Sequence, residues 1–128
     1  MTFRDLGKEW MEYATRDLST ARFILGMKPR PLEIICFHCQ QAVEKSLKAY
    51  LALNGKELPR THDLVKLSRS CAGINDGFNQ FHPACERLND FSVRTRYPSQ
   101  NEISEEDVEL AIKFAGEIFD FVNTEFAK

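Results

Sequence analysis

The sequence predicts an all-α fold, an antiparallel up-down bundle of four main helices plus one short helix. Two observations predict it. Apolar residues recur three and four positions apart through most of the chain, and no stretch alternates apolar and polar residues at strand spacing. The 128 residues show no repeat and no break in composition, so we expect a single helical domain, residues 1–128.

The first predicted helix covers residues 2–25. Thr2 suits its N-cap and Asp5 its first turn, where a carboxylate favours the positive end of the helix dipole. The segment GMKPRP then ends the helix. The apolar residues that repeat at helical spacing are Leu6, Trp10, Tyr13, Ala14, Leu18, Ala21 and Leu25.

The second predicted helix lies between Pro31 and the pair Asn54-Gly55. Proline has the φ angle of a first helical turn, and Asn-Gly supplies the left-handed residue that commonly follows a helix. The third, short helix begins near Thr61-His62-Asp63 and ends near Gly73.

The fourth predicted helix begins around Phe78 or at Pro83 and gives way to the segment SVRTRYPSQNE, in which Pro98 disfavours helix at the residue before it. Ser104 is a strong N-cap for the fifth, because three acidic residues follow it in the first turn. This last helix is expected to run to about Phe126.

Charge and hydropathy exclude several classes of protein. The net charge of −2 argues against a general polyanion binder, so only a local basic patch could serve nucleic acid. No run approaches the roughly 20 apolar residues that span a bilayer, and the first residues, MTFRDLGKEW, lack the pattern of a signal peptide. We therefore expect a cytoplasmic protein without a membrane partner, its four cysteines reduced.

The stretch CFHCQQAVEKSLKAY at residues 36–50 brings cysteine and histidine together. At 100° per residue, Cys36 and Cys39 fall in the middle of the apolar arc of the helix. His38 falls on the opposite side, in a polar arc of roughly 80°. The other members of that polar arc are Gln41, Lys45 and Lys48.

Two cysteine chemistries remain to be weighed. Zinc could be held by Cys36, Cys39, His82 and Cys85, but such pairs usually occupy a turn rather than the middle of an apolar helix. A thioredoxin-like site needs a preceding strand and a helix N-terminus, and neither is predicted. We therefore expect buried thiols, no metal and no cofactor, with Cys71 partly exposed near a helix end.

The polar arc has two interpretations. Histidine, glutamine and two lysines over about three turns suit an anionic ligand or an acidic partner. Alternatively the arc is a solvated face, with Glu44 paired to Lys48 and Lys45 free in water.

A second polar group lies in SVRTRYPSQ. Arg94, Arg96 and Tyr97 could hold a phosphate and stack a base, or the arginines could simply favour the negative end of a helix dipole. His62 is similarly open to a capping, a structural or a binding role.

Three stretches read together resemble the HEPN domain family, named for higher eukaryotes, prokaryotes and nucleotide binding. They are FHCQQAVEKSLKAYL at residues 37–51, THDL at 61–64 and RYP at 96–98, and the resemblance spans roughly residues 10–126. It implies a helical bundle, a homodimer with polar residues in a cleft near the interface, and a minimal nucleotidyltransferase as partner in a toxin-antitoxin-like system.

In nuclease members of that family, an Arg and a His four to six residues after it form a metal-independent RNase site. Here no His follows Arg94 or Arg96 within that range, and Asn101, which occupies one such position, cannot act as a general acid or base. The resemblance therefore implies a nucleotide-binding protein that is not a ribonuclease.

Our leading hypothesis is that Arg94, Arg96 and Tyr97 bind a nucleotide or an RNA phosphate. Further contacts are expected from His38, Gln41, Lys45 and His62. Two alternatives stay open: a weak metal-independent ribonuclease that uses a histidine from elsewhere in the chain, and a structural module for dimerisation or docking.

Overall fold

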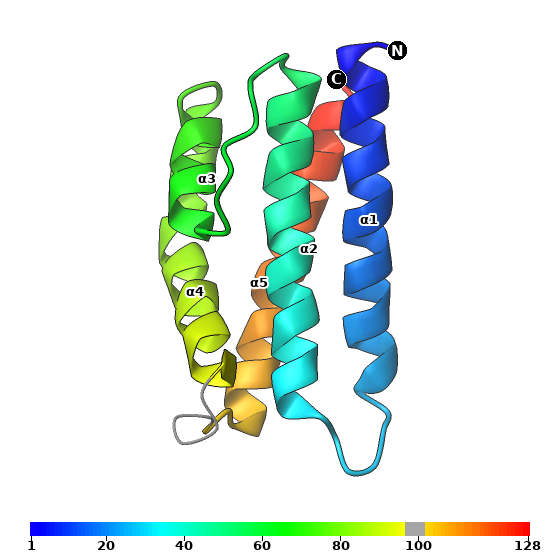
Figure 1. Ribbon diagram of the computed structural model, residues 1–128, viewed down its shortest axis with the longest axis vertical. Coiled ribbons are helices and arrows are strands. Elements are labelled where there is room, and N and C mark those ends of the chain that lie inside the picture. Colours follow the sequence, from blue (N-terminus) through cyan, green and yellow to red (C-terminus); the bar gives the residue numbers. More distant parts are fainter. Residues whose placement is uncertain (97–101) are drawn as a thin grey trace.

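Four long helices alternate in direction along the chain, which confirms the predicted all-α up-down bundle (Figure 1). The computed structural model describes residues 1–96 and 102–128, with residues 95 and 96 described in their backbone only. Within these residues the elements are α1 (Phe3–Ile24), α2 (Leu32–Leu53), α3 (Leu64–Ala72), the 3₁₀ helix η1 (Asp76–Phe81), α4 (His82–Arg96) and α5 (Glu105–Phe126).

The first helix begins where its capping residues predict. The hydroxyl of Thr2 accepts a hydrogen bond from the Asp5 amide, and the Asp5 carboxylate accepts one from the Thr2 amide. Two residues of the predicted apolar series, Leu6 and Tyr13, are nevertheless exposed, because they lie at the margin of the buried stripe. That stripe consists of Met11, Ala14, Leu18 and Ala21.

The second helix is the centre of the bundle and contacts α1, α3, α4 and α5. Its apolar arc faces the core as predicted, with Ile35, Cys36, Cys39, Val43 and Leu47 no more than 1% exposed. Gly55, after the helix, has a φ of +69° and lies against the ring of Phe3. A side chain at Gly55 would therefore be strained and crowded.

The segment after α2 returns along the bundle before α3 begins, so α2 and α3 run in the same direction (Figure 1). The N-cap of α3 is Asp63, whose carboxylate accepts hydrogen bonds from the amides of Val65 and Lys66. Leu64 and Leu67 are fully buried. The third helix thereby fills the space between α2 and the first half of α4.

The fourth helix begins at the later of its two predicted starts and ends within the segment SVRTRYPSQNE. Phe78 lies in η1, and α-helix begins only at His82, so Pro83 is the better of the two predicted starts. At its other end α4 continues into SVRTR as far as Arg96, because Leu88 and Phe91 anchor it in the core.

The fifth helix has the predicted N-cap. The side chains of Ser104 and Asp107 each accept a hydrogen bond from the other's amide. Asp107 is buried, which becomes important for the arginines of α4. No helix among the described residues is long and apolar enough to cross a bilayer.

Candidate functional site

The polar arc of α2 is neither free nor simply solvated. His38 Nδ1 lies 2.9 Å from Asp17 Oδ1 of α1, and Lys45 Nζ donates to Asp17 Oδ2. Asp17 is buried, with only 12% of its side chain exposed, whereas His38 and Lys45 are each 25% exposed. One carboxylate beneath the surface therefore holds a histidine and a lysine at its rim, and the contact at Nδ1 leaves His38 Nε2 available.

A second buried carboxylate lies on the other side of the polar arc. Glu44 receives a hydrogen bond from Lys48, 3.1 Å away, which confirms the i,i+4 pair expected from the sequence. Its other oxygen lies 2.9 Å from Nδ1 of His62, whose side chain is 75% exposed. Glu44 thus fixes one nitrogen of the THDL histidine and leaves its Nε2 toward solvent.

Two glutamines complete this second group. Gln41 donates to Gln40 at 2.9 Å, and Gln40 donates to the carbonyl oxygen of His62 at 3.4 Å. The backbone and the ring of His62 are therefore both held by α2.

The THDL segment is also joined to α4. Asn89 donates to the Asp63 carboxylate at 2.8 Å and accepts from the Leu64 amide at 3.1 Å. Hydrogen bonds consequently link α2, THDL and α4 in one network, although the three segments lie far apart in the sequence.

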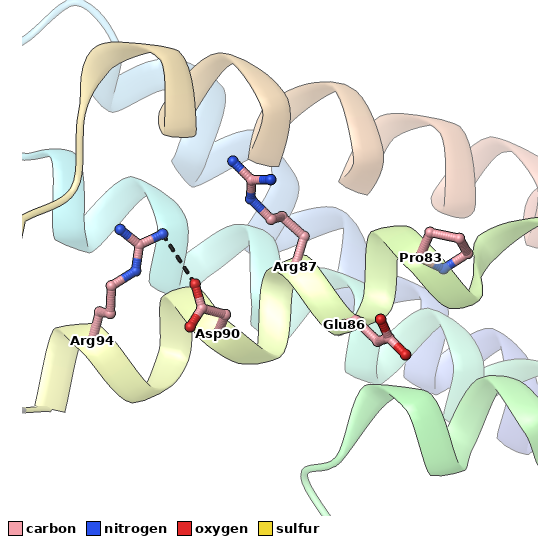
Figure 2. A pocket seen from close by; sticks show the side chains of 5 residues that line it. All are labelled: Pro83, Glu86, Arg87, Asp90 and Arg94. Atoms are coloured by element: carbon pink, nitrogen blue, oxygen red, sulfur yellow. Dashed lines mark ion pairs between the residues drawn. The ribbon is translucent and has the colours of Figure 1, made fainter.

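Arg94 faces the other side of α4, toward α5. Its guanidinium lies 3.1 Å from Asp90 and 3.5 Å from Asp107, and it donates to the carbonyl oxygen of Glu102 at 3.3 Å. Figure 2 shows Arg87 and Arg94 extending to the same side of α4, while Glu86 points away from them.

An open groove of about 630 Å³ is lined by Pro83, Glu86, Arg87, Asp90 and Arg94. Both guanidiniums lie over the Phe91 ring, with Cζ 5.7 Å from its centroid for Arg87 and 5.1 Å for Arg94. The carboxylates of Asp90 and Asp107 offset both positive charges. The groove therefore offers little net attraction to a phosphate, and Arg94 ties the end of α4 to the start of α5.

Helix register separates the positions of Arg94 and Arg96, which are two residues apart in the sequence. Positions 94 and 96 differ by about 200° around a helix, whereas 89 and 96 differ by only about 20°. Arg96 therefore occupies the side of α4 on which Asn89 contacts THDL. The side chain of Arg96 and all of Tyr97 lie outside the described residues.

The four cysteines are free and buried. Burial raises the pKa of both Cys36 and Cys39 to about 12, and it also raises the pKa of Cys71, so neutral thiols are favoured. Cys71 is 0% exposed, which corrects the expectation of partial exposure: its thiol points inward and donates to the Leu47 carbonyl.

Nothing among the described residues resembles a metal centre. No group of three or more His, Cys, Asp or Glu side chains is arranged to hold an ion. His82, the histidine of the zinc hypothesis, contacts Ser68 at 2.7 Å and Asn79 at 3.0 Å instead.

Comparison with known proteins gives the family. The HEPN domain family matches residues 8–125, which is almost the whole chain. The chain belongs to the HEPN domain family.

Two solved structures share the HEPN fold of this chain. TT1696 from Thermus thermophilus superposes with a TM-score of 0.82 at 25% identity, covering 92% of this chain and 96% of that one. ST0689, an archaeal HEPN homologue, gives 0.72 at 23% identity, covering 94% and 97%, and at that identity shows the fold alone. No curated protein matches the sequence.

Three polar residues of this HEPN domain escaped the sequence analysis: Asp17, Gln40 and Asn89. Each forms a contact with a residue more than 20 positions away in the sequence. Asp17 carried a weak signal, since it borders the inward stripe of α1 where a charged residue needs a partner.

Proposed function

We propose that this HEPN domain binds a nucleotide or an RNA phosphate without cleaving RNA, as a homodimer that works with a nucleotidyltransferase in a toxin-antitoxin-like pair. The ligand lies beside THDL. Arg96 supplies the phosphate contact and Tyr97 stacks on the base, with His62 and Gln41 providing hydrogen bonds. His38 and Lys45 extend the same face of α2, and Arg94 holds α4 in position.

One observation carries the proposal. The network from Gln41 through Gln40 to the His62 carbonyl, and from Asp63 to Asn89, joins two of the segments on which the family resemblance rests, residues 37–51 and THDL, to the body of α4. Buried polar networks that are well satisfied hold their members in one geometry. Such a preformed surface suits ligand binding, because less entropy is lost when the ligand arrives.

The chemistry of the face supports binding over catalysis. Nδ1 of His62 faces the Glu44 carboxylate, which only accepts, so Nε2 of the neutral ring is left as a free acceptor for the amino group of a base. Lys48 is paired with Glu44, so it is less available to stabilise the charge of a transition state. The absence of the family's histidine after Arg96 points the same way.

Calorimetry with a panel of ribonucleotides tests the proposal. We expect the wild type to bind at least one of them, and Arg96→Ala to weaken binding about tenfold or more, the usual scale for a charge-assisted hydrogen bond. His62→Ala should weaken the same ligand. Arg69→Ala removes an exposed arginine of α3 and serves as the control.

Two outcomes contradict the proposal. No heat of binding from the wild type at millimolar nucleotide rules out the ligand class, and equal affinity of Arg96→Ala rules out the site. Cleavage of a mixed RNA pool by the purified wild type, lost in His62→Ala, would instead establish the ribonuclease alternative.

A further inference from the structure

A second surface with nucleic-acid chemistry lies between α1 and α2. We call it the α1–α2 platform, and its members are Tyr13, Arg16, Phe37, His38 and Lys45. The first three have no role in the proposed function, and the last two serve there only as an extension of the α2 face. Their arrangement depends on the packing of two helices and is absent from any short motif.

The members of the platform form a continuous series of contacts. Arg16 Cζ lies 5.1 Å from the centroid of the Tyr13 ring, and Lys45 Nζ lies 5.9 Å from the same centroid. At the other end, the rings of Phe37 and His38 have centroids 5.4 Å apart at an angle of 76°. Asp17 joins the two halves, because it contacts both Lys45 and His38.

The two aromatic rings are open to solvent. Tyr13 is 51% exposed and Phe37 is 49% exposed, although both lie on well-packed helices. Burial within the chain does not explain them. Every nucleobase has a π face that can stack on such a ring, irrespective of its sequence.

The charge of the platform is positive where the rings are exposed. Arg16 has no ion pair among the described residues, and its guanidinium is shared only with the Tyr13 ring. Arg16 and Lys45 are permanent cations and Asp17 offsets one of them, so these three side chains together carry about one positive charge. Since Asp17 is 12% exposed, a ligand meets the cations before the carboxylate.

We propose that the α1–α2 platform binds single-stranded nucleic acid, with bases stacked on Tyr13 and Phe37 and phosphates held by Arg16 and Lys45. The proposal rests on the proposed function in that the ligand is a nucleic acid, but it adds a surface that shares only His38 and Lys45 with the face beside THDL. The domain then takes an oligonucleotide in preference to a mononucleotide, because two rings apart from THDL add stacking contacts.

A second copy of the chain fits this surface less well. In a two-fold interface the same patch meets itself, so two platforms, each with the cations Arg16 and Lys45, would be brought together. Like charges brought together across an interface are unfavourable, whereas a phosphate between cations is favourable.

Fluorescence anisotropy with labelled twelve-nucleotide oligo-U and oligo-dT tests the platform. The double variant Tyr13→Ala, Phe37→Ala should raise Kd about tenfold or more, from the loss of two stacking contacts. Tyr13→Phe keeps the ring and should bind like the wild type. Phe23→Ala removes another exposed aromatic ring of α1, 83% exposed, and is the matched control.

Salt dependence gives an independent measurement. Arg16→Ala should reduce the slope of log K against log salt by about 0.7, the value for one single-strand phosphate contact. Tighter binding of oligo-U than of oligo-dT would identify RNA as the form recognised. Equal binding would show that the platform accepts both RNA and DNA, and either result supports the proposal.

The outcomes that overturn the proposal differ from those that overturn the proposed function. Oligonucleotide affinity unchanged in the double variant, or no binding by the wild type, rejects the platform even if mononucleotides still bind in calorimetry. A change in the mass of the assembly measured by light scattering, with oligonucleotide affinity unchanged, would assign the platform to dimerisation instead. Mononucleotide binding should be unchanged in the double variant and weakened in Arg96→Ala.

Discussion

Asp17 shows how one residue can organise a surface. Its carboxylate contacts a histidine and a lysine that lie 21 and 28 positions further along the chain, and it is almost covered by them. Removing one partner of a buried ion pair leaves the other charges without compensation, which costs more than the pair itself contributes.

Asp17→Ala should therefore lower the free energy of unfolding by about 1 to 3 kcal/mol, because His38 and Lys45 lose their shared acceptor. Urea denaturation followed by circular dichroism measures the change. Glu12→Ala, an exposed carboxylate of the same helix, should leave the midpoint unchanged. Equal midpoints for wild type and Asp17→Ala would show that the cluster contributes nothing to stability.

At the residue scale, the sequence predicts which side of its own helix a residue occupies. The angular arithmetic placed Cys36 and Cys39 in the core and His38 on the opposite side, and the structure agrees. It could not pair Lys45 with Asp17, because that contact depends on how α1 lies against α2. A periodic pattern predicts the helix face on which a residue lies, but not the residue that it contacts on another helix.

The short helix α3 illustrates the scale of the element. Asp63 caps it and also accepts from Asn89 of α4, so one side chain begins the helix and fixes its position. Burial raises the pKa of Asp63, but hydrogen bonds from Asn89 and from the amides of Lys66 and Val65 outweigh this and hold the pKa below its ordinary value.

Asp63→Ala should cost about 1 to 2 kcal/mol at pH 7, the usual loss for an N-cap. Because the folded pKa is depressed, the contribution of the carboxylate is fully present above its unfolded pKa and is lost as the pH falls through the lower, folded pKa. The stability difference between wild type and variant should therefore shrink below about pH 4. Urea titrations at pH 7 and pH 3 check this, with Glu57→Ala as the exposed control. A difference that stays constant with pH would contradict it.

Helix boundaries followed from the sequence wherever a local cap decides them. Thr2 and Ser104 both form the predicted caps, the latter with Asp107 as its reciprocal partner. The start of α4 was ambiguous because Phe78 is recruited into a cluster of aromatic rings, which holds the chain as a 3₁₀ helix first. The rings around it are those of Tyr50, Phe81 and Phe121.

The fold of the whole molecule brings together segments that lie far apart in the sequence. The resemblance predicted that α2, THDL and the end of α4 belong together. Gln40 joins α2 to THDL by a hydrogen bond, and Asn89 joins THDL to the body of α4. Arg94 pairs with Asp107 of α5. The grouping of Arg94 with Arg96 stays a prediction, because two positions that are two residues apart differ by about 200° around a helix.

Close packing of the three helices around Gly7 gives a prediction for the bundle as a whole. A Cβ at Gly7 would lie 2.8 Å from Cζ of Phe126 in α5 and 3.0 Å from the backbone oxygen of Ala49 in α2. A Cβ at Gly116 would meet only the far end of the flexible Arg22 side chain, 3.1 Å away. Both glycines lie within helices, so both replacements improve helix propensity.

Gly7→Ala should nevertheless destabilise the protein by about 1 to 3 kcal/mol, because a backbone atom cannot yield as a side chain can and α1 must move away from α2 and α5. Gly116→Ala should stabilise it by up to about 1 kcal/mol through propensity alone, since Arg22 can rotate away. Thermal unfolding of both variants beside the wild type measures the two signs. A stabilising Gly7→Ala would mean that α1 packs less closely than these distances require. The packing of α1 on α2, which brings Asp17 to His38 and Lys45, would then be less close as well.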